Sequence, residues 1–195
     1  MITLTAMNTG SLRIALAAAL AVAGCSHGAG QKYQDKNMDF GSIRTVAVLP
    51  FGNLSRDNLA AERVRDVFAN MLLASGALYV VPPGEVARGI GKVGVPNPTA
   101  PNVEEITRLG TALKAEAVIT GVVKEYGEVR SGTATGNIVA MSIQMFETAT
   151  GKLVWAGTTT KGGVTFGDRL LGEGGQPLND VTEAAVDDLL NKLFK

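Results

Sequence analysis

The chain has 195 residues, an apolar fraction of 46%, and equal numbers of acidic and basic side chains, 18 of each. This length suits one domain with short appendages, and the apolar fraction is sufficient for a packed core. A formal net charge of zero gives no basic footprint for nucleic acid, so we expect no nucleic-acid partner.

Residues 1–24 have the features of a secretory signal peptide. Arg13 supplies a positive charge, and the segment IALAAALAVA, residues 14–23, is apolar but too short to span a bilayer. Either Met1 or Met7 is a suitable start for this signal. It ends directly before Cys25, the only cysteine of the chain.

The residues before Cys25 decide how this cysteine is interpreted: Val22, Ala23 and Gly24. The segment VAGC resembles the lipobox of bacterial lipoproteins. The resemblance implies that the thiol receives a diacylglyceryl group, that cleavage makes Cys25 the mature first residue, and that acyl chains such as palmitate hold the protein on a membrane. A serine directly after the cysteine, here Ser26, resembles the pattern of lipoproteins that are sorted to the outer membrane. We therefore expect a lipid-anchored protein on the periplasmic face of the outer membrane, with the inner membrane as the alternative.

The segment that follows the cysteine is polar and contains glycine. We expect residues 25–42 to be the lipidated cysteine and a flexible tether, and residues 43–195 to form a single globular domain. The only histidine, His27, falls in this tether and has no neighbouring carboxylate or second histidine. It therefore does not indicate a metal or catalytic site.

Apolar periodicity predicts the elements of the domain in chain order. Five strands are expected over residues 44–51, 77–82, 116–129, 137–147 and 152–162. Helices are expected over residues 58–75, 83–90, 102–114 and 177–194, and a loop over residues 163–176. The fold class is thus α/β (α+β), with a mixed sheet of about five strands, the order β-α-β-α-(α)-β-β-β-α, and helices packed on the sheet.

The predicted domain contains neither cysteine nor histidine, which excludes Cys-His and Ser-His-Asp catalysis and zinc sites built from those residues. The segment GIGKVG, residues 89–94, matches a dinucleotide fingerprint by letter. It follows a predicted helix instead of a strand, so we interpret it as a glycine-rich hinge. We expect no enzyme activity, no cofactor and no metal.

Candidate contact residues for a protein partner are the aromatic and apolar side chains of the last strands and of the loop. Trp155 lies in the middle of a predicted strand and is either a core residue or a contact anchor. The other candidates are Tyr126, Phe166, Leu170 and Leu171.

Four segments, VAVLPFGNLS, ASGALYVVPPGEV, GTALKAEAVITGVV and FETATGKLVWAG, resemble the CsgG/LpoB-like group of bacterial envelope lipoproteins. The resemblance to the N-terminal domain of TolB is more distant. The matching positions are 46–51, 75–81, 109–121 and 146–155.

This resemblance implies an outer-membrane lipoprotein with a non-catalytic, periplasmic protein-binding domain that acts in cell-envelope assembly, similar to the penicillin-binding-protein activators. The alternative is a self-associating accessory or structural subunit of a CsgG-like secretion or curli-type complex. The expected partners are the membrane, through the lipid, and an envelope protein, with a homo-oligomer as a further option.

Overall fold

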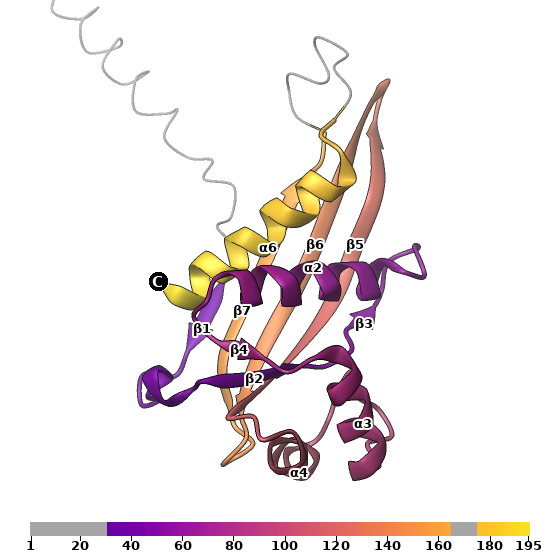
Figure 1. The fold of residues 1–195 in the computed structure, drawn as a ribbon. Coiled ribbons are helices and arrows are strands. Elements are labelled where there is room, and N and C mark those ends of the chain that lie inside the picture. Colours follow the sequence, from indigo (N-terminus) through magenta and orange to yellow (C-terminus); the bar gives the residue numbers. More distant parts are fainter. Residues whose placement is uncertain (1–30, 165–174) are drawn as a thin grey trace, which may run out of the picture.

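A seven-stranded mixed sheet organises residues 31–164 and 175–195, which are the part of the chain that the computed structural model describes. The strands run in the order β1-β7-β6-β5-β2-β4, and β3 pairs with β5 beside β2 (Figure 1). Their bounds are β1 Lys32–Gln34, β2 Thr45–Val48, β3 Gly52–Asn53, β4 Tyr79–Val80, β5 Ala117–Ser131, β6 Ala134–Glu147 and β7 Leu153–Gly162.

Four α-helices within the described residues pack against this sheet, as the α+β class predicted. They are α2 Ala60–Ala74, α3 Pro83–Val93, α4 Val103–Leu113 and α6 Leu178–Phe194, and a short 3-10 helix, η2, covers Phe40–Ser42. β2, β3, β4 and β5 are parallel where they pair, whereas β5, β6 and β7 form an antiparallel meander. The mixed sheet is confirmed, but it has two strands more than expected, β1 and β3.

The helix ends follow from local chemistry. Asn102 caps α4 through a capping box: its side chain accepts a hydrogen bond from Glu105 N at 2.9 Å, and the Glu105 carboxylate accepts one from Asn102 N at 2.7 Å. Gly76 follows α2 with a φ of +66°, and Gly94 ends α3 with a φ of +72°. Glycine adopts these left-handed conformations without a steric cost.

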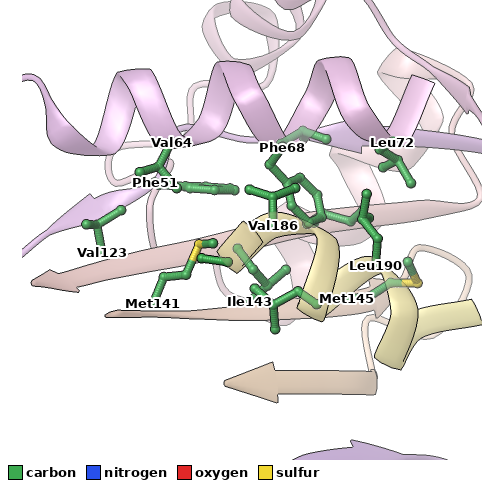
Figure 2. Close-up of a cluster of buried hydrophobic side chains, with 14 of the residues drawn as sticks. Phe51, Val64, Phe68, Leu72, Val123, Met141, Ile143, Met145, Val186 and Leu190 are labelled. Atoms are coloured by element: carbon green, nitrogen blue, oxygen red, sulfur yellow. The ribbon is translucent and has the colours of Figure 1, made fainter. Parts of the chain in front are cut away.

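Two apolar clusters lie on opposite faces of the sheet. In the larger cluster, α2 and α6 cover β5, β6 and β7, and Figure 2 shows their side chains meeting there. Val139, Met141, Ile143 and Met145, which alternate along β6, all belong to it, as expected for residues on one face of a strand. The smaller cluster joins α3 and α4 to β2 and β5.

Two expectations from the sequence are corrected by the fold. Residues 32–34, within the expected tether 25–42, form β1 and pair antiparallel with β7. The segment 89–94, interpreted as a hinge, belongs to α3 up to Val93. Gly89 is buried there against Leu113 of α4, so this glycine provides close helix packing instead of a hinge.

Candidate protein-binding groove

A groove of about 500 Å³ lies between the chain that follows β3 and the free edge of β5. We call it the β5-edge groove. Its lining residues are Leu54, Ser55, Arg56, Lys124, Glu125, Tyr126, Gly127, Glu128, Val129, Arg130 and Ile138. It is the place where a predicted contact residue, Tyr126, meets apolar and charged side chains from a distant part of the sequence.

The groove exists because β5 is much longer than the strands on its outer side. β2 and β3 pair with β5 only up to Val123, and the last hydrogen bond runs from Leu54 N to Val123 O at 2.8 Å. From Lys124 to Ser131, β5 pairs only with β6 among the described residues. An unpaired strand edge of this kind can accept a further extended strand.

The backbone of Glu128 points to this free edge. Glu128 lies opposite Asn137 of β6, and Asn137 O accepts its hydrogen bond from Gly163 on the other side, at 2.7 Å. The pair is therefore a non-hydrogen-bonded pair of the antiparallel ladder, in which the backbone groups of both residues point away from each other. The N–H and C=O of Glu128 are accordingly available at the groove.

A β-bulge sets the direction of the groove side chains. The register between β5 and β6 shifts between Val123 and Glu125, so Lys124 is an additional residue on β5. Beyond the bulge, Tyr126 lies opposite Val139 and packs partly buried against the larger cluster. Tyr126 therefore joins the core to the groove.

The rim of the groove is mixed in charge and includes one exposed apolar side chain. The lining includes three basic side chains, Arg56, Lys124 and Arg130, and two carboxylates, Glu125 and Glu128. An exposed ion pair of 3.3 Å joins Arg130 to Glu128. Leu54 is 73% exposed. An apolar anchor beside a free strand edge suits a polypeptide ligand better than a small anion or cation.

The structure answers the question about Trp155. The side chain is 1% exposed and belongs to the larger cluster, so it is a core residue and not a contact anchor. Its indole Nε1 has no hydrogen-bond partner among the described residues. Gly157 makes room for the ring, because a Cβ at that position would overlap the ring atoms of Trp155.

The remaining predicted positions lie outside the described residues. These are the lipobox Val22, Ala23 and Gly24, the lipidation site Cys25, and the loop residues Phe166, Leu170 and Leu171. They stay predictions.

The best-connected polar cluster of the described residues holds α6 on β7. Asp188 accepts hydrogen bonds from Thr159 Oγ1 at 2.8 Å and from Lys192, and it forms an ion pair with Lys161 at 3.0 Å. Partial burial raises the pKa of Asp188, but the hydrogen bonds from Lys192, Thr159 and Lys161 outweigh it and lower the pKa to about 2. These mutual contacts satisfy the cluster, which is structural.

The carboxyl end of β2, where open α/β sheets often bind ligands, is occupied by a side chain of the protein. Arg65 of α2 donates hydrogen bonds to Val48 O at 2.8 Å and to Leu49 O at 3.0 Å. Burial lowers the pKa of Arg65, against the opposing effect of Asp66 and Glu62. Arg65 thus joins α2 to the sheet.

Within residues 31–164 and 175–195, no three or more His, Cys, Asp or Glu side chains lie together in an arrangement that could hold a metal ion. None of the helices in these ranges is both long and apolar enough to cross a membrane.

Solved structures share this fold. PelC from Paraburkholderia phytofirmans, solved as a dodecamer, matches with a TM-score of 0.56 and 17% identity, over 84% of this chain and 96% of that chain. Lipoprotein GNA1162 from Neisseria meningitidis matches with a TM-score of 0.55 and 18% identity, over 77% of this chain and 98% of that chain. The C-terminal domain of LpoB from Escherichia coli matches with a TM-score of 0.47 and 15% identity, over 63% and 86%.

No protein-family model matches the chain, and the search of curated protein sequences found no match. The structural matches confirm the resemblance at the level of the fold. A bacterial lipoprotein, GNA1162, has this fold over nearly its whole solved length.

Proposed function

We propose that this chain is an outer-membrane lipoprotein whose periplasmic domain binds an extended segment of another envelope protein in the β5-edge groove, without catalysing a reaction. The observation that carries the proposal is the free edge of β5 beside the exposed Leu54. The lipobox before Cys25 and the fold shared with GNA1162 support the lipoprotein part.

The position of β1 limits which partners this protein reaches. With β1 held on β7, the tether after Cys25 comprises at most residues 26–30 instead of the expected 26–42. A flexible segment of that size has an average end-to-end distance of only about 13 Å. A partner at or near the same membrane therefore fits better than a penicillin-binding protein that is reached across the periplasm.

Site-specific crosslinking in living bacteria tests the proposed groove. A photo-crosslinking amino acid replaces the exposed Leu54, and a second variant carries it at Arg88 on α3 as a control position. We expect a protein adduct from position 54 and none from position 88. Equal adducts from both positions would contradict the groove as the binding site.

A matched pair of backbone variants then tests strand addition. Glu128→Pro removes the N–H that points to the free edge and leaves the ladder to β6 intact, whereas Glu128→Ala removes only the side chain. We expect the adduct at position 54 to be lost in the first variant and retained in the second. An adduct that consists of two copies of this chain would favour a self-associating subunit, the option in keeping with the dodecamer that PelC forms.

A further inference from the structure

The described chain begins on the outer edge of β7. Thr158 N donates a hydrogen bond to Gln31 O at 3.0 Å, and Lys32 lies opposite Gly157 in the register of β1. The place at which the tether joins the domain is therefore fixed on one edge of the sheet.

A lipid on Cys25 would be close to this edge. From Cys25 to Gln31 the chain takes six residue-to-residue steps, which span no more than about 20 Å when fully extended. We propose that the β1 edge of the domain rests on phospholipid headgroups, so that the domain has one membrane-facing side. This inference depends on the proposed lipid anchor at Cys25.

The chemistry of the edge suits an anionic headgroup layer. The charged groups of β1 and its following turn are Lys32, Asp35 and Lys36, a net charge of +1. Farther along β7 and on α6, Lys161 and Lys192 share the single carboxylate of Asp188 and leave one further positive charge in excess. Lys32 is exposed and Lys161 is 39% exposed in its side chain. Such clusters attract the negative surface of a membrane within a Debye length.

Tyr33 adds an aromatic side chain to the same edge. It lies opposite Ala156 of β7 and is 50% exposed. A tyrosine combines an apolar ring with a polar hydroxyl, which favours the boundary between headgroups and acyl chains.

The β5-edge groove lies toward the opposite edge of the meander, away from β1. One row of the register runs from Gly52 through Val122 and Ser142 to Thr158, which contacts Gln31. β3 and β1 are thus separated by four strand spacings, about 19 Å, and they lie on opposite sides of the meander in Figure 1. With β1 on the membrane, the groove faces away from it.

Fluorescence quenching on the full chain, purified from membranes with its lipid, tests this orientation. A lipidated Cys25 leaves no free thiol, so Tyr33→Cys and Leu54→Cys each provide one site for a fluorescent label. The labelled proteins are placed in vesicles of phosphatidylcholine with phosphatidylglycerol and a lipid that is spin-labelled at its headgroup. We expect quenching at position 33 to exceed that at position 54 by about twofold or more.

The role of the basic side chains at the β1 edge is tested in the same vesicles. Lys32→Glu, or omission of phosphatidylglycerol, is expected to reduce the quenching at position 33. Equal quenching at positions 33 and 54 would overturn the orientation, and quenching that is indifferent to both changes would overturn the role of the basic cluster. The mass of the purified protein separates these results from a failed anchor, because a protein without acyl groups contradicts the proposed function itself.

Discussion

The carboxylate of Asp188 on α6 accepts a hydrogen bond from the hydroxyl of Thr159 on β7, at 2.8 Å, and this contact joins the last helix to the last strand. Lys161 and Lys192 bring two positive charges to the same carboxylate, which is 24% exposed. The cluster therefore has a defined pH dependence.

Stability should fall in acid partly through Asp188. The pKa of Asp188 in the folded protein is about 2, below the ordinary value of 3.8. The carboxylate therefore contributes fully to the free energy of unfolding above pH 3.8, and this contribution is lost as the pH falls through about 2. Because the group is partly solvated, we expect only about 1 kcal/mol. Chemical denaturation of the wild type and of Asp188→Asn at several pH values measures it. A difference that grows toward low pH would contradict this assignment.

Replacing Trp155 tests its role in the core. Trp155→Ala removes a fully buried ring and should lower the free energy of unfolding by about 3–5 kcal/mol. Trp155→Phe keeps most of the packing and also removes the indole N–H that has no partner among the described residues, so it should cost much less. Urea titration of both variants provides the comparison. Full stability of Trp155→Ala would show that the ring is not a core residue.

Two helical glycines should respond differently to alanine. A Cβ at Gly110 would overlap the Cβ of Thr148, and the Thr148 hydroxyl is fixed by hydrogen bonds to Ala115 O at 2.7 Å and Glu116 O at 3.0 Å. Gly110→Ala should therefore destabilise the fold by about 1–3 kcal/mol.

At Gly89 the Cβ would meet only the end of the Leu113 side chain, which can move. The higher helix propensity of alanine offsets part of the cost of this shift, so Gly89→Ala should destabilise the fold less than Gly110→Ala. Thermal unfolding of both variants checks this order, and the reverse order would contradict the close approach of α4 to Thr148.

Lipidation depends on the thiol of Cys25. Cys25→Ser should abolish incorporation of labelled palmitate and leave the signal uncleaved by the lipoprotein peptidase, because serine does not take part in the thioether chemistry. Ser26→Ala keeps the thiol and serves as the control with retained label. Palmitate that persists in Cys25→Ser would refute the proposed anchor.

The sequence predicted the elements whose own residues specify them. The strand expected over residues 137–147 contains most of β6, and the helix expected over residues 102–114 matches α4 together with its N-cap Asn102. β1 was missed because the segment Lys32–Gln34 is polar and exposed and has no alternation; it is a strand only because the edge of β7 accepts it. The segment 89–94 was misinterpreted because the reason for Gly89 lies in another helix, at Leu113.

The groove could not be predicted as a whole. Tyr126 was identified from its residue type, but nothing in the local sequence brings Leu54 to it. That neighbourhood arises from the parallel pairing of β3 with β5, which joins positions 52 and 53 to positions 122 and 123. Trp155 had the residue type of a contact anchor, and only the packing of α6 over β7 shows that it is covered.

The short strand β1 also determines how the domain would respond to mechanical tension at its N-terminal end. A force that acts on residue 31 is taken up first by the three residues of β1 and their hydrogen bonds to one edge of β7. If β1 detaches, the chain up to Asn37 becomes extensible, because Met38 and Phe40 still pack against the larger cluster, and the central strands β5 and β6 stay paired. Under tension, detachment of β1 would therefore lengthen the linker while the rest of the domain stays folded.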